Sequence, residues 1–418
     1  MDARQTIQAL GTAARAAAAK LATATGELRD AALHHAAAGI RAATADLQAA
    51  NAEDLETARG MGLSDAMIDR LTLTDKRVAA MATALEQIAA QTDPVGETLD
   101  GYNRPNGLRV EKRRVPIGVV GIIFESRPNV TADAGGLCLK SGNACILRGG
   151  KEAIRSNLAI AAVLGDALEK AGLPRQAVTM IDTTDRAIVP AMATAEGLID
   201  VIIPRGGHGL IRAVVEAATI PVIKHYNGNC HVYVHNAADL AMAQTIILNA
   251  KCQRPGVCNA AETLLVDEAV AEAFLPGAAK ALLKAGVQLR GCERTCNLID
   301  PAMAATDEDW DTEYLDLVLA IKVVDGLDAA IAHINAHGSG HTDAIVTGHL
   351  AAADAFVAAV DSASVMVNAS TRFSDGGEYG LGAEIGISTD KLHARGPMGA
   401  ADLTTYKWIV TGNGHVRG

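Results

Sequence analysis

The segment VPIGVVGIIF, residues 115–124, is the most informative about the fold. It is nearly all apolar and rich in β-branched side chains, as expected of a strand buried on both faces of a sheet. The pattern changes to a helical one over Asn129–Lys140, and an apolar segment at 144–147 then ends in glycines. This order of strand, helix and strand predicts the first unit of an α/β fold.

The same alternation continues through the first half of the chain. Strands are expected at 177–182 and 198–204, and helices at 151–171 and 210–218. Strands separated by helices of this length predict a parallel, doubly wound sheet. Ligands in such sheets bind beyond the carboxyl ends of the strands, which directs attention to the segments after each strand.

The second half repeats the alternation, and a boundary near Gly228 separates the halves. Its expected strands lie at 230–235, 262–267, 319–325, 344–348 and 364–368.

The N-terminal region, residues 1–90, has apolar residues at helical spacing, and turn-forming sequences close this region before residue 108. The segment LRVEKRR at 108–114 alternates enough to form a strand, and its charges suit an edge or an interface.

Composition limits the classes of protein that fit the chain. Its 418 residues are enough for two or three domains, and 49% hydrophobic content with 20% charged residues fits a soluble α/β protein. The net charge of −11 argues against nucleic acid or an anionic membrane as the main partner. We expect neither a signal peptide nor a membrane span, and therefore a cytoplasmic location.

The seven cysteines are scattered, which is typical of free thiols in a reducing compartment. Cys292 and Cys296 have no ligand partners at metal spacing nearby, so no metal site is expected. Cys258 stands out because QRPGVCNA places it after a Pro-Gly turn, between a helix and a strand. Arg254 could favour its thiolate, and nearby backbone N–H groups could receive an oxyanion. A buried structural thiol is the alternative.

Two glycine-rich turns each follow a strand and open a helix, where phosphates bind well. They consist of Arg148, Gly149, Gly150 and Lys151, and of Pro204, Arg205, Gly206 and Gly207. The G-x-G-x-x-G fingerprint is absent, so nucleotide binding and plain turn glycines both stay open. His225, in KHYNGNCH, could be a general base or a structural histidine.

Long segments of the chain resemble the gamma-glutamyl phosphate reductases, a family within the aldehyde dehydrogenase superfamily. The resemblance is strongest in VPIGVVGIIFESRPNVTADAGGLCLKSGNACILRGGKEA, VIIPRGG, PVIKHYNGNCHVYV, QRPGVCNAAETLLV and FSDGGEYGLGAEIGIST. It implies an aldehyde dehydrogenase-like α/β fold with two doubly wound parallel-sheet domains and a small β oligomerisation element. The cofactor domain would span 1–98 and 115–227, the catalytic domain 228–400, and the oligomerisation element 99–114 and 401–418.

The resemblance also implies a reaction. NADPH would reduce L-glutamyl 5-phosphate to L-glutamate 5-semialdehyde and phosphate through a thioester on Cys258, a step of proline biosynthesis. Hydrolytic relatives carry a water-activating Glu where this chain has His225, so the thioester would be protected from water. Asn129 is the first choice for the side-chain oxyanion donor and Ser126 the second.

Binding roles follow from the same resemblance. Arg148 matches the ribose-binding Lys of the superfamily and favours NADPH because it can receive a 2′-phosphate. Glu313 matches the Glu that holds the nicotinamide ribose. The candidates for the phosphate and α-carboxylate of the substrate are Arg127, Arg254 and Arg372.

The expected assembly is a homodimer or homotetramer, and the lability of an acyl phosphate favours contact with glutamate 5-kinase. The residues alone do not exclude three other functions. They are a related acyl-phosphate or acyl-thioester reductase with another substrate, a cysteine hydrolase with His225 as base, and a noncatalytic nucleotide-binding module.

Overall fold

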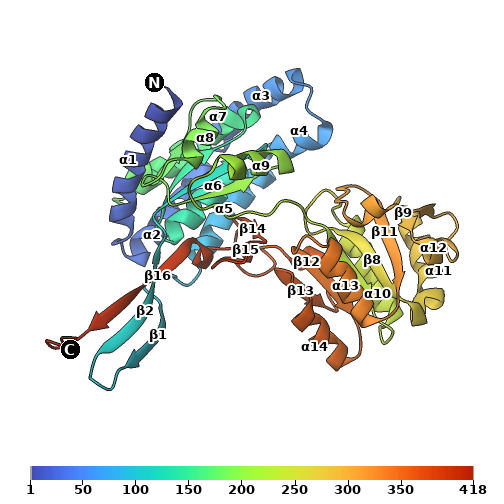
Figure 1. Ribbon diagram of the computed structural model, residues 1–418. Coiled ribbons are helices and arrows are strands. Elements are labelled where there is room, and N and C mark those ends of the chain that lie inside the picture. The colour runs from blue at the N-terminus through green and yellow to red at the C-terminus, as the bar shows by residue number, and fades with distance from the viewer. Residues whose placement is uncertain (1, 418) are drawn as a thin grey trace.

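The computed structural model describes residues 2–417, except the side chain of Ala66. Met1 and Gly418, the outer ends of two predicted domain ranges, lie outside the described residues. Figure 1 shows two lobes joined by loops, with a long β arm that leaves the first lobe. Among the described residues, no helix combines the length and apolar character needed to cross a membrane.

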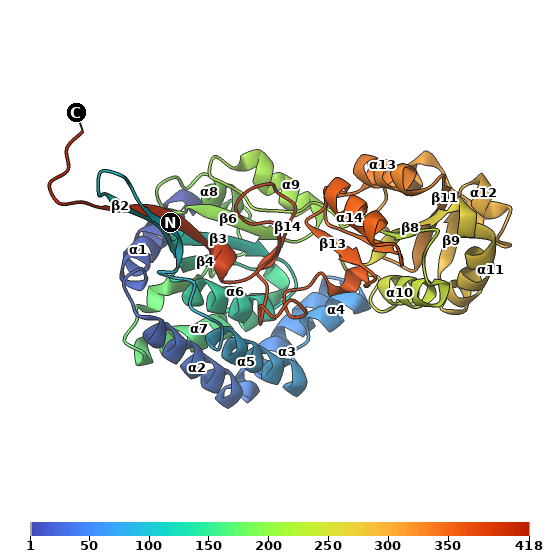
Figure 2. The ribbon, with the colours of Figure 1, turned by 90° about the horizontal axis from the view of Figure 1, so that it is seen from below.

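A parallel four-stranded sheet forms the centre of the first lobe, in the order β5-β4-β3-β6. Every residue of β3 is buried. Helices cover both faces, with α2, α5, α6 and α7 on one side and α8 and α9 on the other (Figure 2). The strands are β3 (Val119–Phe124), β4 (Ala144–Arg148), β5 (Val178–Met180) and β6 (Val201–Arg205). The helices are α1 (Ala3–Leu21), α2 (Gly26–Ala42), α3 (Thr44–Gly60), α4 (Asp65–Leu71), α5 (Asp75–Ala89), α6 (Asn129–Lys140), α7 (Ile154–Lys170), α8 (Ile188–Ala193) and α9 (His208–Ala217).

The predicted strand at 115–124 is two strands in two different sheets, which corrects the expectation from sequence. The first, β2, ends at Pro116, and β3 begins at Val119. Gly118 lies between them with a φ of +132°, a conformation that favours glycine. A β-carbon at Gly118 would stand 2.2 Å from the Asp200 carboxylate, so the break also needs a residue without a side chain.

A parallel seven-stranded sheet forms the second lobe, in the order β10-β9-β11-β8-β7-β12-β13. Val232 and Val234 of β7 pack into the core beneath α10 and α11, whereas Tyr233 packs into a separate core beneath α13 and α14. Successive side chains of a strand point to opposite faces, so one apolar strand supplies both cores. The strands are β7 (Cys230–Val234), β8 (Ala261–Asp267), β9 (Gln288–Gly291), β10 (Met303–Ala304), β11 (Val318–Val324), β12 (Thr342–Val346) and β13 (Ser364–Val367). The helices are α10 (Leu240–Cys252), α11 (Glu268–Lys284), α12 (Glu293–Cys296), α13 (Leu327–His337) and α14 (Leu350–Ala359).

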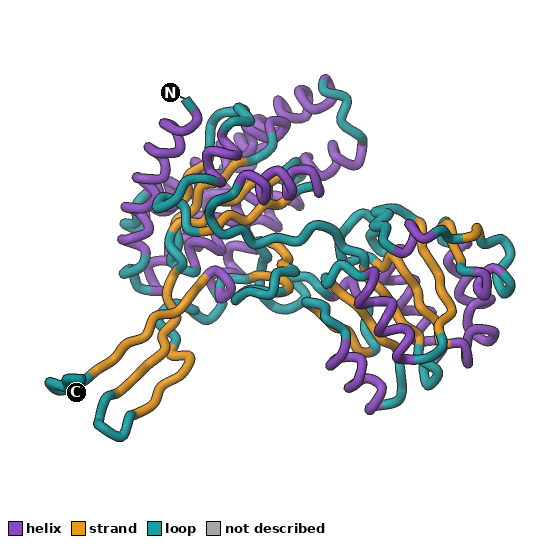
Figure 3. The backbone as a smooth tube through the Cα atoms, viewed as in Figure 1, coloured by secondary structure: helices purple, strands orange, loops and turns teal. Residues whose placement is uncertain are grey.

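The arm is an antiparallel three-stranded sheet of β1 (Thr98–Asn103), β2 (Arg109–Pro116) and β16 (Thr404–Thr411). The strand predicted from LRVEKRR at 108–114 therefore pairs with β16, in the C-terminal part of the predicted oligomerisation element. Figure 3 shows that the projecting part of the arm contains only strands and loops. The arm leaves large side chains exposed, including Tyr102, Tyr406 and Trp408.

The chain returns to the first lobe before residue 400, where β14 (Gly386–Ser388) pairs with β15 (Gly396–Met398). Ile385, Met398 and Leu403 belong to the core of the first lobe. The predicted catalytic domain at 228–400 therefore includes the segment of β14 and β15, which packs against the first lobe. The sequence did not reveal this, because glycine-rich loops give no periodic signal of the core they join.

Candidate active site

A cavity of about 1060 Å³ opens where the two lobes meet. The first lobe lines it with residues at the carboxyl ends of its strands, such as Glu125 after β3, Arg148 in β4 and Arg205 in β6. The second lobe contributes residues just before its strands, such as Cys258 before β8, and the loop that leads into β7 contributes His225. The carboxyl ends of the first sheet therefore face the amino ends of the second across one cavity.

Cys258 lies on the loop between α10 and β8, as expected from its Pro-Gly turn, and is half-buried. Its carbonyl oxygen accepts a 3.2 Å hydrogen bond from the Cys230 thiol. Gly228 packs against the same carbonyl, and a β-carbon there would stand 1.8 Å from the oxygen. The Gly256 carbonyl accepts a 3.2 Å hydrogen bond from Arg70 of α4, which ties the loop to the first lobe.

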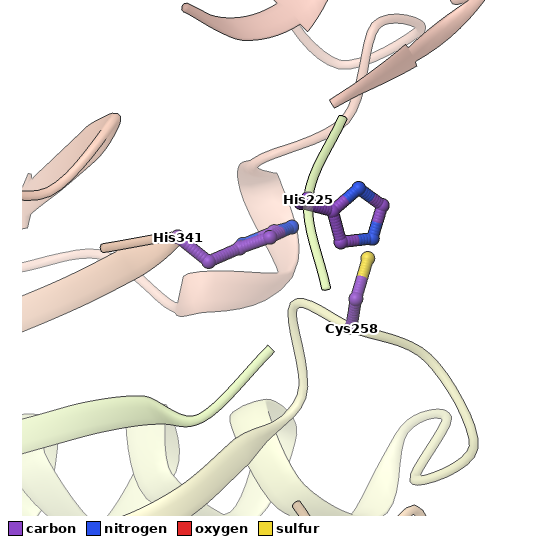
Figure 4. Close-up of side chains that lie close together, drawn as sticks. All are labelled: His225, Cys258 and His341. Atoms are coloured by element: carbon purple, nitrogen blue, oxygen red, sulfur yellow. The ribbon is translucent and has the colours of Figure 1, made fainter. Parts of the chain in front are cut away.

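Two histidines converge on the thiol (Figure 4). One ligand atom each of Cys258, His225 and His341 lies within 4.8 Å of the other two. His225 Nδ1 is 2.8 Å from the Ile387 carbonyl oxygen. His341 is fully buried, which lowers its pKa to about 4 and leaves it neutral at neutral pH. Sequence reasoning missed His341, because it lies far from Cys258 in the chain and in no motif.

The three predicted substrate arginines, Arg127, Arg254 and Arg372, all line the cavity. Burial lowers the pKa of Arg127 to about 10, and the positive charges of Arg205 and other arginines act in the same direction. Burial and the charge of Arg254 also lower the pKa of Arg372, whose Nε donates a 2.8 Å hydrogen bond to Gln253. The thiol therefore faces a concentration of guanidinium groups inside a chain whose net charge is −11.

The turn after β4 brings Arg148, Gly150 and Lys151 to the cavity, whereas Gly149 packs against Asn157 outside its lining. Burial is the main influence on Arg148 and lowers its pKa. Its Nε is buried with no hydrogen-bond partner among residues 2–417. Such an unpaired donor fits a bound anionic or polar ligand.

The turn after β6 places Arg205, Gly206 and Gly207 in the cavity wall, whereas Pro204 lies within the strand behind it. The Gly207 N–H, at the start of α9, donates a 2.9 Å hydrogen bond to Glu125 Oε2. An internal carboxylate therefore occupies a helix N-terminus of the kind that binds phosphate. The sequence singled out the glycines but gave no sign that Glu125 pairs with them.

Glu313 also lines the cavity, and its Oε1 accepts a 2.8 Å hydrogen bond from the Gly228 N–H. Burial raises its pKa. The hydrogen bond fixes the segment that packs against Cys258, so Glu313 orders the site as well as lining it.

Asn129 is not brought to the thiol, so the structure does not support it as the oxyanion donor. It is the first residue of α6, is exposed and lies outside the cavity lining. Its side chain donates a 2.9 Å hydrogen bond to Asp133. The second choice, Ser126, does line the cavity, but its hydroxyl donates to Glu152 at 2.7 Å. Ser126 has a φ of +39°, and the next residue, Arg127, lines the cavity together with Cys258.

The fold is that of an aldehyde dehydrogenase, and the family model named "Aldehyde dehydrogenase family" matches residues 1–302. The chain is 56% identical over 405 residues to a gamma-glutamyl phosphate reductase of Rhodopirellula baltica, covering 97% of this chain and 93% of the relative. The chain therefore belongs to the aldehyde dehydrogenase family and, within it, to the gamma-glutamyl phosphate reductases.

Solved structures agree with this assignment. A gamma-glutamyl phosphate reductase from Thermotoga maritima superposes with a TM-score of 0.96 at 46% identity, covering 99% of this chain and 100% of the other. An engineered glycolyl-CoA reductase with bound NADP⁺ shares the fold, with a TM-score of 0.68 at 15% identity over 97% of this chain and 96% of the other. A nicotinamide cofactor is common to the aldehyde dehydrogenase family.

Proposed function

We propose that the chain catalyses the NADPH-dependent reduction of L-glutamyl 5-phosphate to L-glutamate 5-semialdehyde and phosphate, a step of proline biosynthesis. The observation that carries this proposal is the position of Cys258, a half-buried thiol in a cavity lined by Arg127, Arg254 and Arg372. An acyl phosphate offers a carbonyl for the thiolate and negative charges for the arginines. The 56% identity to a gamma-glutamyl phosphate reductase supports the same substrate.

The first step is attack of the Cys258 thiolate on the substrate carbonyl. The carbon–sulfur bond forms, the bond to the phosphate oxygen breaks, and phosphate leaves with its electron pair. The N–H of Cys258 and the guanidinium of Arg127 are the proposed donors to the oxyanion, in place of Asn129. Donors that are fixed before the reaction stabilise such an oxyanion by about 3–4 kcal/mol each.

The second step reduces the thioester. A nicotinamide cofactor held by residues such as Arg148 and Glu313 would supply the hydride chemistry that this reduction needs. Cys258 then leaves as a thiolate, and the aldehyde is released. His225 stands where the hydrolytic relatives carry a Glu, so no carboxylate at this position activates water against the thioester.

The cofactor residues are the members of the predicted set that line the cavity, namely Arg148, Gly150, Lys151, Arg205, Gly206, Gly207 and Glu313. The unpaired Nε of Arg148 and the backbone of Gly150 suit a ribose phosphate that approaches the chain closely. Arg186 also lines the cavity, and its charge acts on Arg148. Two guanidinium groups next to each other favour a 2′-phosphate and therefore NADPH over NADH.

The arm is the proposed oligomerisation element of a homodimer or homotetramer. Every residue of β1 is exposed in the single chain, as are Tyr406 and Trp408 of β16. Exposed aromatic side chains on an open sheet are typical of a surface that pairs with another chain.

A contact with glutamate 5-kinase is also proposed, because it would shorten the exposure of the labile acyl phosphate to water. The proposed location is the cytoplasm.

The experiment that tests the proposed substrate compares NADPH oxidation on L-glutamyl 5-phosphate, generated from L-glutamate and ATP by a kinase, with oxidation on acetyl phosphate and on acyl-CoA thioesters. The expected result is rapid oxidation with the glutamyl substrate only. Preference for another acyl donor would assign the chain a different substrate, and phosphate release without NADPH oxidation would make it a hydrolase.

A further inference from the structure

His341 lies fully buried at the cavity, and acyl-phosphate reduction gives it no role. Its Nδ1 is 2.9 Å from the Thr342 hydroxyl, whereas its Nε2 is buried with no hydrogen-bond partner among the described residues 2–417. The imidazole extends toward His225 and Cys258 (Figure 4). An unpaired buried nitrogen is costly, so its presence beside a thiol points to a ligand.

We propose that Cys258, His225 and His341 form a binding site for a thiophilic divalent cation, best fitted by Zn²⁺, which inhibits the enzyme reversibly. One ligand atom from each residue lies within 4.8 Å of the others. Zinc prefers thiolate and imidazole ligands in a tetrahedral arrangement, with bonds of about 2.0–2.3 Å. Those bonds place neighbouring ligand atoms roughly 3.5 Å apart. The three ligand atoms must therefore move slightly closer together, and the half-buried His225 side chain can make this movement.

The groups behind the two imidazoles already orient them as neutral ligands. The Ile387 carbonyl engages His225 Nδ1 at 2.8 Å, and the Thr342 hydroxyl engages His341 Nδ1. Both contacts leave Nε2 as the ligand atom, and such contacts are how proteins usually orient a histidine toward a metal. The carboxylates of Glu384, Asp343 and Glu313 lie close enough to His341 for their negative charge to act on it.

Binding involves no redox change. The Cys258 thiol loses its proton to solvent and donates a sulfur electron pair to the cation, and each imidazole donates a nitrogen lone pair. The fourth position stays open to water or an anion. While the cation is bound, the sulfur electron pair cannot attack an acyl carbon, so cation and acyl phosphate exclude each other.

The test measures binding of the metal alone to metal-free full-length chain. Zn²⁺ is followed by calorimetry, and Co²⁺ by the sulfur-to-cobalt charge-transfer absorption that only thiolate coordination produces. The variants are Cys258→Ser, His225→Gln and His341→Gln. The matched controls are Cys252→Ser, another half-buried thiol, and His34→Gln, an exposed histidine on α2. Circular dichroism checks that each variant is folded.

The expected result is one cation per chain, with the charge-transfer band absent in Cys258→Ser. Affinity should fall about tenfold or more in each histidine variant and stay unchanged in both controls. If His341→Gln does not fold, His225→Gln alone decides. A band that persists in Cys258→Ser, or undiminished affinity in the folded histidine variants, overturns the proposal. None of these readouts needs turnover, so they stand apart from the test of the proposed reaction.

Discussion

The backbone of Gly228 packs directly against Cys258, so that a β-carbon on residue 228 would lie 1.8 Å from the Cys258 carbonyl oxygen. The Gly228 N–H is held at the same time by Glu313 at 2.8 Å. This contact between Gly228 and Cys258 brings together two segments, one just before β7 and one just before the neighbouring strand β8. The position of the thiol in the cavity therefore depends on a residue with no side chain.

We expect Gly228→Ala to reduce kcat by about a hundredfold or more, because a methyl group must displace the loop that carries the thiol, and small displacements of reacting groups have effects of this size. The measurement is steady-state kinetics together with the rate of Cys258 alkylation. Gly209→Ala is the matched control, because a β-carbon at Gly209 meets nothing within 4 Å. Wild-type kinetics in Gly228→Ala would show that the loop position is not critical.

Arg148→Ala should raise the KM for NADPH about tenfold to a hundredfold and leave that for NADH nearly unchanged. The reason is the loss of a charge-assisted hydrogen bond to the 2′-phosphate. Kinetics with both cofactors measure the effect. Arg212→Ala is the control, because Arg212 is exposed on α9 and pairs with Glu216. An equal increase in the KM values for NADPH and NADH would contradict the role of Arg148 in NADPH preference.

His225→Glu should partly convert the reductase into a hydrolase, because a carboxylate beside the thioester can activate water. Phosphate release would then exceed NADPH oxidation, whereas the wild type should give one phosphate for each NADPH oxidised. His225→Gln separates loss of the histidine from gain of the carboxylate and should keep the two products equal. Equal stoichiometry in His225→Glu would mean that something else protects the thioester.

The stability of the folded chain should respond to pH through Asp133. Burial raises its pKa from 3.8 to about 6, opposed by a hydrogen bond from Asn129. Because the folded-state pKa is the higher one, the stability contributed by the protonated form is fully present below about pH 3.8 and lost as the pH rises through about 6. Asp133→Asn should therefore gain thermal stability relative to the wild type between about pH 4 and pH 7. A difference in Tm that does not change over this range would contradict the assignment.

The fold was largely predictable because buried parallel strands are continuous apolar runs, and β3, β7 and β8 were visible for that reason. The break at Gly118 was not, because the close approach of the Asp200 carboxylate to Gly118 is a contact between residues far apart in the chain. The return of Ile385 and Met398 to the first lobe was also invisible, because it depends on tertiary packing.

The site was predictable where local sequence sets the geometry, as in the turn that presents Cys258 and the glycines after β4 and β6. It was not predictable where partners meet across the fold. His341, the Glu125 carboxylate at Gly207 and the close approach of Gly228 all belong to this class. Asn129 also belongs to this class, because its position outside the cavity lining and its hydrogen bond to Asp133 appear only in the fold.

The proposed mechanism makes Cys258 the residue that carries the thioester, and Cys258→Ser is the sharpest test of that role. We expect this variant to show no NADPH oxidation dependent on L-glutamyl 5-phosphate, while NADPH still raises its Tm as it does in the wild type. Cys252→Ser should retain full activity. Oxidation of NADPH by Cys258→Ser at the wild-type rate would rule out a thioester on this residue.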